Sequence, residues 1–250
     1  MNKVIFDIKK FSHVTGENID VSFIPMMQRR KLNKFGRAAL FTLYGAYEGG
    51  SPNLVFASNY GDVERVEKLI EQRKEDGEVS PAGFGSSVHN AVIGLFSLLE
   101  KINTSYNSIS AGENSISAGF LESILSEESL FCYAESLGGI KSVSVLTSQN
   151  PKGDYVLSGK DYNTSPLAAD LRTDGAKRNP DSEWIAPIGA KLLRRNSTSV
   201  EQIQDGEVDM LNEACELSRA DEGFVKFIDF LEGRADEFVS DLYVIKRRAL

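Results

Sequence analysis

The stretch from Asn107 to Phe120 has the order of residue types that enzymes use to present a nucleophile. Alternating residues just before it predict a strand, and small residues around Gly112 predict a tight turn. Asn114 or Ser115 can cap a helix whose apolar residues follow at helical spacing. Such an elbow holds a side chain at a helix N-terminus, where backbone N–H groups stabilise an oxyanion. The tip of this elbow, however, is Gly112, which has no nucleophilic group.

Two polar residues near Gly112, Ser115 and Glu113, have side chains that could take part in catalysis, but a structural role explains each of them as well. Ser115 next to Glu113 could be a hydrolase nucleophile. The Gly-x-Ser-x-Gly spacing of hydrolases is absent, which favours a capping or packing role for Ser115. A carboxylate such as Glu113 is stabilised at a helix N-terminus by the helix dipole, whatever its function.

The cysteines and histidines are few and scattered. The chain has two of each, Cys132, Cys215, His13 and His89, and their spacing is not that of a zinc site. No glycine-rich phosphate loop or dinucleotide fingerprint is present either, so we expect neither a metal nor an organic cofactor. A Cys–His pair would have to use these residues, but Cys132 lies in a predicted buried strand, where cysteine usually packs.

A second distinctive segment is basic and contains Arg29, Arg30 and Lys31. Apolar residues then recur every three or four positions as far as Gly49, which predicts a helix whose first half is basic. The charges either lie on a solvated helix face or form a docking patch for an acidic carrier or partner protein.

Composition excludes several classes of function. The chain has 250 residues, of which 41% are hydrophobic and 26% charged, as in ordinary globular proteins of one or two domains. The net charge of −8 argues against nucleic acid or an anionic membrane as the main partner. No apolar run can span a bilayer, and the N-terminus does not resemble a secretory signal. Two cysteines make no disulfide framework, so we predict a cytoplasmic protein without an integral membrane segment.

Strands and helices alternate along roughly the first 140 residues, which predicts an α/β layered sheet. The predicted strands lie near residues 4–8, 53–58, 106–110, 130–134 and 143–146, and we expect the last of these to end the sheet. Residues 62–76 predict a helix, residues 80–85 a loop, and residues 86–99 a helix that is apolar on almost every side and therefore buried. His89 and Asn90 lie inside this last predicted helix.

The pattern changes after Lys141. A long polar stretch from Asn150 to about Asn196 has few recognisable elements, and helical spacing returns at 200–217 and 224–231. We therefore divide the chain into residues 1–148, a layered α/β domain, and residues 149–250, a partly helical region of unassigned fold.

Four segments resemble the N-terminal half of a β-ketoacyl synthase of the thiolase-like fold. They are RKLNKFGR at 30–37, VFASNYGD at 55–62, SPAGFGSSVHNA at 80–91 and SAGENS at 110–115. The third is the most specific, because ketosynthases have a Ser-Pro loop followed by a helix that carries an Asn and a small-residue pair, here Asn90 and Ile93-Gly94. From Arg29 to about Ala134 the chain looks closest to the short chain-length-factor-like proteins of aryl polyene and related type II pathways.

This resemblance implies an αβα-layered ketosynthase N-terminal half that has lost its catalytic groups. The nucleophilic cysteine of the family falls on Gly112, or on Glu113 in an alternative register. The active-site histidines and lysine of the family belong to a C-terminal half that a chain of this length cannot hold intact. The resemblance thus implies a non-catalytic subunit that forms a heterodimer with a β-ketoacyl-ACP synthase and shapes its acyl tunnel. Acyl carrier protein would be a partner of the whole complex rather than of this chain alone.

The resemblance also indicates which residues would contact the partner. In this fold the strand before the elbow pairs with its counterpart across a twofold axis, since a buried strand edge needs partners for its backbone groups. The helix and loop that contain residues 84–94 would line the same interface, where a bulky side chain would shorten the product. The expected tunnel and interface residues are Phe84, Ser87, His89, Asn90, Ala91, Gly94, Ser108 and Ser110. Ordinary packing is the alternative for each of them.

Two other functions stay open at this point. An acyl-transferring or hydrolysing enzyme would use Ser115 or Cys132. A free-standing module that binds acyl carrier protein would use the basic segment Arg29–Lys31, and salt would weaken its binding.

Overall fold

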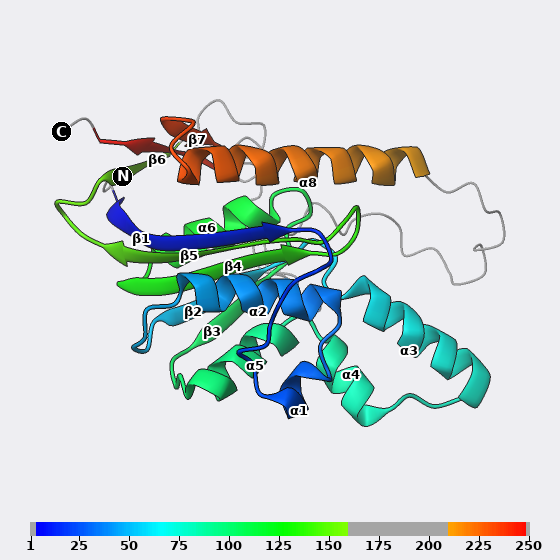
Figure 1. Ribbon diagram of the computed structural model, residues 1–250. Helices are drawn as coiled ribbons and strands as arrows, with labels where there is room; N and C mark the ends of the chain where they lie inside the picture. The colour runs from blue at the N-terminus through cyan, green and yellow to red at the C-terminus, as the bar shows by residue number, and fades with distance from the viewer. Residues whose placement is uncertain (1–3, 160–209, 249–250) are drawn as a thin grey trace, which may run out of the picture.

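The computed structural model describes residues 4–159 and 210–248, with side chains at 4–158 and 221–248 (Figure 1). Eight strands of these residues form one mixed sheet in the order β3-β2-β4-β5-β1-β6-β8-β7. The strands are β1 (Val4–Thr15), β2 (Asn53–Ala57), β3 (Tyr106–Ile109), β4 (Glu128–Glu135), β5 (Lys141–Gln149), β6 (Tyr155–Gly159), β7 (Glu237–Val239) and β8 (Tyr243–Arg247). β2 runs parallel to β3 and β4, and the remaining neighbours are antiparallel.

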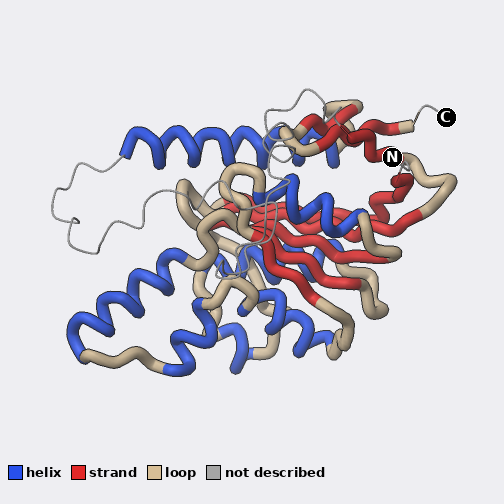
Figure 2. Tube along the Cα trace, turned by 180° about the vertical axis from the view of Figure 1, so that it is seen from behind, coloured by secondary structure: helices blue, strands red, loops and turns tan. Residues whose placement is uncertain are grey.

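Helices cover both faces of this sheet, which gives the αβα layering expected from the sequence (Figures 1 and 2). They are α1 (Met26–Arg29), α2 (Lys34–Ala46), α3 (Val63–Asp76), α4 (Pro81–Ser87), α5 (Ala91–Glu100), α6 (Ser115–Ile124) and α8 (Met210–Leu231). Helices α2 and α5 pack on one face, and α6 and α8 pack on the other. In β2, Leu54 and Phe56 belong to the first of these two cores, whereas Val55 and Ala57 belong to the second, so this strand is buried on both sides as predicted.

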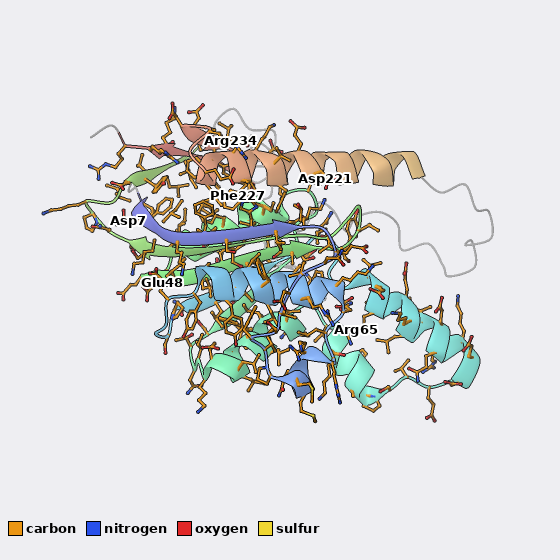
Figure 3. The ribbon with its side chains drawn as sticks, in the orientation of Figure 1. Asp7, Glu48, Arg65, Asp221, Phe227 and Arg234 are labelled. Atoms are coloured by element: carbon orange, nitrogen blue, oxygen red, sulfur yellow. The ribbon has the colours of Figure 1, made fainter. Side chains whose placement is uncertain are left out.

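The C-terminal residues complete the second core. The Phe227 ring on α8 lies with its centroid 4.8 Å from that of Phe120 on α6 and 5.1 Å from that of Phe238 on β7 (Figure 3). Strand β6 pairs with β1, and β8 pairs with β6, so the sheet continues past residue 148. The expectation that 143–146 would be the last strand is wrong, because β5 is followed by three further strands of the same sheet.

The helix predicted over 86–99 is also wrong in its bounds. Residues 81–87, expected in part to be a loop, form α4, which Ser80 caps by accepting a hydrogen bond from Gly83 N at 3.3 Å. Val88 is extended, so the helix ends before His89 and Asn90, and α5 starts in a new direction 93° away. Helix α5 is buried on one side only, and the Leu98 side chain is 78% exposed.

We had expected the basic segment to form the first half of a long helix, and this expectation is wrong. Arg29 ends the short helix α1, and Arg30 and Lys31 lie in the turn that follows it. Helix α2 begins only at Lys34, because Asn33 caps it by accepting a hydrogen bond from Gly36 N at 3.1 Å. Helix α3 is capped by Asp62 and ends at Gly77, as predicted.

The C-terminal helical spacing at 224–231 belongs to α8, and the residues of the expected helix that precede Met210 lie outside the described residues. In the described ranges, each helix taken by itself is too short or too polar to cross a bilayer. The bent pair α4 and α5 meets the requirement by its combined length and composition only.

Candidate functional site

The elbow is present, and its tip is a glycine. Strand β3 leads into a turn in which Gly112 has φ of +56°, a backbone conformation that suits glycine, and α6 follows. Asn114 occupies the N-cap position but makes no side-chain cap bond. Ser115 Oγ accepts a hydrogen bond from Ala111 N at 3.0 Å and donates one to Gly112 O at 2.7 Å. Ser115 therefore closes the turn, and with 1% of its surface exposed it is not placed to attack a substrate.

Cys132 is likewise placed for packing rather than reaction. It lies on β4 in the core under α2, where Thr42, Ser142 and Ser144 surround it. Burial raises the pKa of its thiol to about 11, although hydrogen bonds from the neighbouring hydroxyls act in the opposite direction. A thiol of this kind is protonated at neutral pH and therefore weakly nucleophilic.

The loop after β2 is held by a buried carboxylate at the carboxyl ends of the parallel strands. Glu135, at the end of β4, is 2% exposed and accepts hydrogen bonds from Asn59 N at 2.8 Å and Tyr60 N at 3.1 Å. Ser58 Oγ donates to the same oxygen at 3.2 Å. The loop in turn contacts the elbow, because Ser110 Oγ donates to Asn59 O at 2.9 Å. Residues 58–60 of the segment VFASNYGD at 55–62 therefore have a structural role, because they hold the loop against Glu135 and the elbow.

His89 connects the same loop to the edge strand. Its Nε2 lies 3.1 Å from Ser58 O, and its Nδ1 lies 2.6 Å from Ser108 Oγ. A carbonyl oxygen only accepts hydrogen bonds, so Nε2 carries the ring proton and Nδ1 accepts from the Ser108 hydroxyl. Three of the predicted site residues, His89, Ser108 and Ser110, are thus brought together at one end of β2 and β3.

The remaining predicted tunnel residues lie on α4, on α5 and in the bend between them. Phe84 on α4 is 59% exposed, and Ser87 Oγ donates to the Phe84 carbonyl at 2.8 Å. Asn90 is the N-cap residue of α5, without a side-chain cap bond, and Ala91 is the first residue of that helix. A Cβ on Gly94 would meet only Tyr106 Oη within 4 Å, at 3.9 Å, so α5 faces β3 at this point with room for a side chain.

Strand β3 is at one edge of the sheet, and β7 is at the other. The carbonyl of Ser105, just before β3, accepts from Leu54 N of β2, and the carbonyl of Ile109 accepts from Ser58 N, just after β2. Since backbone groups alternate in direction along a strand, those of Tyr106 and Ser108 point away from β2. Large apolar side chains are exposed on β3 and on the neighbouring α4–α5 segment: Phe84, Val88, Leu98 and Tyr106.

The predicted docking residues lie beside a hollow in the surface that the sequence did not reveal. The hollow is lined by Arg30, Lys31, Leu32, Asn33, Arg65 and Lys68. Arg65 and Lys68 belong to α3, and the sequence analysis assigned neither of them to a site. They join the basic segment because Asn33 Nδ2 donates to Asp62 Oδ1 at 2.6 Å, which places the starts of α2 and α3 side by side.

A second, polar hollow lies next to the elbow and includes Glu113. Helix α8 and the β7–β8 hairpin form its other side with Glu222, Lys226 and Asp241, which the sequence did not indicate as neighbours of the elbow. Within the described ranges, no three His, Cys, Asp or Glu side chains are grouped so that they could hold a metal ion.

Comparison with known proteins identifies the class of this fold as the thiolase-like fold of ketosynthases. Residues 9–129 match the β-ketoacyl synthase N-terminal domain family, which confirms the resemblance carried by the four sequence segments. No curated protein matches the chain.

Two solved structures are similar to this one. The first is the ketosynthase ApeO in complex with its chain length factor ApeC from Xenorhabdus doucetiae, with 18% identity over 63% of this chain and 83% of the other, and a TM-score of 0.54. The second is AntDE:AntF, a type II polyketide acyl carrier protein in complex with its hexaketide-bound ketosynthase. It has 10% identity over 59% of this chain and 63% of the other, and a TM-score of 0.52. At these identities the likeness shows the fold alone.

Proposed function

We propose that this chain is a non-catalytic, chain-length-factor-like subunit that pairs with a β-ketoacyl-ACP synthase and shapes its acyl tunnel. The systems in which it would act are the type II pathways that make aryl polyenes, polyketides or fatty acids, and we place it in the cytoplasm. The observation that carries the proposal is the edge strand β3, whose outward backbone groups are bordered by the exposed side chains of Phe84, Val88, Leu98 and Tyr106. An edge of this kind is a template for pairing with another strand.

The dense packing of the second core supports the proposal that this chain does not hold the acyl chain in its own interior and acts on it through its surface. Phe120, Phe131 and Phe227 fill the space between α6, the sheet and α8, and their ring centroids are 4.8 to 6.3 Å apart. An acyl chain would have no room between these rings, because protein interiors are close-packed. In the proposed complex the acyl chain lies in the synthase, and the α4–α5 segment of this subunit closes one end of its tunnel.

The names of the similar structures are compatible with this proposal. One is a ketosynthase in complex with its chain length factor, and the other contains a carrier protein with its ketosynthase. In the proposed complex the synthase supplies the nucleophile, since the elbow of this chain has Gly112 at its tip, and acyl carrier protein delivers the substrates.

The test of this function is co-expression of the tagged chain with the ketosynthase encoded nearest to it, followed by size-exclusion chromatography. We expect a one-to-one complex, whereas a lone monomer or homodimer would contradict the proposal. If the complex forms, Gly94→Trp should shorten its product, because the new side chain would enter the space beside Tyr106. Val225→Trp, at an exposed position on α8, is the matched control and should leave the product unchanged.

A second candidate is the acyl-transferring or hydrolysing enzyme, but with a different nucleophile from the two considered first. Ser108 and His89 have the arrangement of a nucleophile and its general base, since Nδ1 is free to accept the hydroxyl proton and Ser58 O orients the ring. In a hydrolysis reaction Ser108 Oγ would attack a thioester carbonyl, and His89 would pass the proton to the departing thiol. Water would then cleave the ester.

This candidate is separated from the first by assaying the chain alone with acyl thioesters. The subunit proposal predicts no turnover above background. Turnover that both Ser108→Ala and His89→Ala abolish would favour the enzyme instead.

A further inference from the structure

Strand β7 forms the second edge of the sheet, and among the residues that the structure describes it pairs with β8 alone. Ser240 N donates to Tyr243 O across the hairpin, so the even-numbered residues of this segment direct their backbone groups to β8. Because backbone groups alternate in direction along a strand, those of Glu237 and Val239 point away from β8. Strand β7 therefore offers the N–H and C=O groups of both residues to a further strand.

Only its short length protects β7 from pairing with such a strand. A lysine or a proline would disfavour pairing at an exposed edge, and neither is present in Glu237–Val239. The one charge on β7 is directed to the neighbouring strand, because Lys246 Nζ on β8 lies 2.8 Å from the Glu237 carboxylate. Since a short strand gives few backbone hydrogen bonds, a partner that binds here needs a further contact.

The further contact is available in the polar hollow between the elbow, α8 and β7, which we call the acidic hollow. Its lining includes Glu113, Glu222, Lys226, Val239 and Asp241. Its volume of about 230 Å³ is below the ~300 to 1,000 Å³ of pockets that hold drug-sized ligands, so it suits a single side chain. Val239 belongs both to the edge and to the hollow, so a strand added to β7 would place a side chain at the hollow.

The charges of the acidic hollow favour a cationic side chain. Lys226 Nζ lies 2.6 Å from Glu222 Oε1, and these two charges neutralise each other. Asp241 is exposed, and its side chain makes no hydrogen bond or ion pair with the residues that the structure describes. Together with Glu113 it gives the hollow an excess of negative charge. A guanidinium group fits best, because its planar fork of donors matches the geometry of carboxylates.

We propose that β7 and the acidic hollow together bind an extended basic segment of a protein partner. The segment adds a strand to β7 and places an arginine or lysine side chain in the hollow, against Asp241 and Glu113. Strand β7 and helix α8 lie outside residues 9–129 that match the family, and β7 is at the opposite edge of the sheet from β3. The site needs no ketosynthase, so its test is independent of the proposed function.

The test uses fluorescence anisotropy with the full chain and a labelled peptide of alternating arginine and valine. One control peptide has glutamine in place of arginine, and a second keeps the arginines but carries a methyl group on every backbone nitrogen. We expect both controls to bind at least about tenfold more weakly, because the first lacks the charge and the second cannot pair with a strand. Equal binding of the methylated peptide would overturn the proposal, and so would calorimetry in which free arginine binds as tightly as the peptide.

A pair of charge variants tests the acidic hollow. Asp241→Lys should weaken binding of the arginine–valine peptide by about tenfold or more, because like charges then face each other. The matched control is Asp76→Lys, which changes the net charge equally at an exposed position on α3, outside the acidic hollow. It should leave binding within about twofold of wild type, since separated surface charges are screened by salt. Equal weakening by the two variants would overturn the proposal, because only the net charge of −8 would then matter.

A second pair of variants tests the edge strand. Val239→Pro removes the N–H that points away from β8, a change that edge strands tolerate, and should reduce binding by about tenfold or more. Val239→Ala keeps this N–H and should bind the peptide more tightly than the proline variant. Circular dichroism melts show whether both variants are folded. Unchanged binding by a folded Val239→Pro would overturn the proposed strand pairing.

Discussion

His89 Nδ1 lies 2.6 Å from Ser108 Oγ, and this hydrogen bond joins the bend between α4 and α5 to the edge strand β3. The other ring nitrogen donates to the loop after β2, so one side chain links three segments that are far apart in sequence. Since the exposed apolar residues of the proposed interface lie on two of these segments, His89 sets the position of one relative to the other.

His89→Ala should therefore weaken the complex with the ketosynthase more than it weakens the fold. We expect a loss of about 1 kcal/mol in unfolding free energy for the lost hydrogen bonds and a fall of about tenfold in affinity for the synthase. Urea unfolding and surface plasmon resonance measure the two. His13→Ala is the control, because His13 pairs with Glu232 on the surface, and it should leave the affinity unchanged.

Glu135→Ala should destabilise the end of the sheet that carries the loop and the elbow. The N–H groups of Asn59 and Tyr60 lose their acceptor, and the nearby buried Lys141 loses a neighbouring negative charge. We expect a cost of about 1 to 3 kcal/mol in urea unfolding, with faster amide hydrogen exchange at Asn59 and Tyr60. Glu122→Ala removes an exposed contact with Asn107 and should cost less than about 0.5 kcal/mol. Equal losses in the two variants would contradict the role assigned to Glu135.

Phe227→Ala should remove much of the stabilisation that α8 gives to the second core. The ring is fully buried and contacts the rings of Phe120, Phe131 and Phe238, so its removal leaves a cavity. A truncation of this kind costs about 3 to 5 kcal/mol, measurable by denaturant unfolding. Val225→Ala changes an exposed residue of the same helix and should be nearly neutral. A small effect of Phe227→Ala would mean that α8 does not pack on the sheet in solution.

Cys132 should be inert in the native protein. With a thiol pKa of about 11, very little thiolate forms at pH 8, and the side chain is buried. In a Cys215→Ser background, iodoacetamide should label Cys132 only when urea unfolds the chain. Rapid labelling of the folded protein at pH 8 would contradict the buried placement and would reopen the cysteine-enzyme interpretation.

The sequence predicted the layered fold and the elbow, because both depend on local patterns. A short run of residues was enough to predict each of three features: the buried strand β2 from its continuous apolar run, the start of α3 from Asp62, and the turn of the elbow from Gly112. The family motifs add the identity of the fold, although the bounds of α4 and α5 were predicted wrongly inside the matched residues.

One failure of the prediction has a local cause. Ser80 caps α4 and Val88 is extended, but the apolar residues around them gave a false impression of one buried helix. The other features that the sequence could not predict depend on contacts between distant residues. Strand β6 extends the sheet by pairing with β1, and β8 extends it further by pairing with β6, in both cases across a long separation in sequence. The hollow lined by Arg30, Lys31, Arg65 and Lys68 likewise depends on a distant contact, because the hydrogen bond from Asn33 to Asp62 brings α2 and α3 together.

The central claim is that β3 pairs with a ketosynthase, and two substitutions at Ser108 test it most directly. Ser108→Ala removes only the hydroxyl, whereas Ser108→Pro also removes the N–H that points away from β2, a change that edge strands tolerate. The measurement is the amount of synthase that co-purifies with each tagged variant, with circular dichroism melts as the folding control. We predict a one-to-one complex for wild type, a moderately weakened one for Ser108→Ala and none for a folded Ser108→Pro. Equal recovery of the synthase with the proline variant, or none with wild type, would contradict the account.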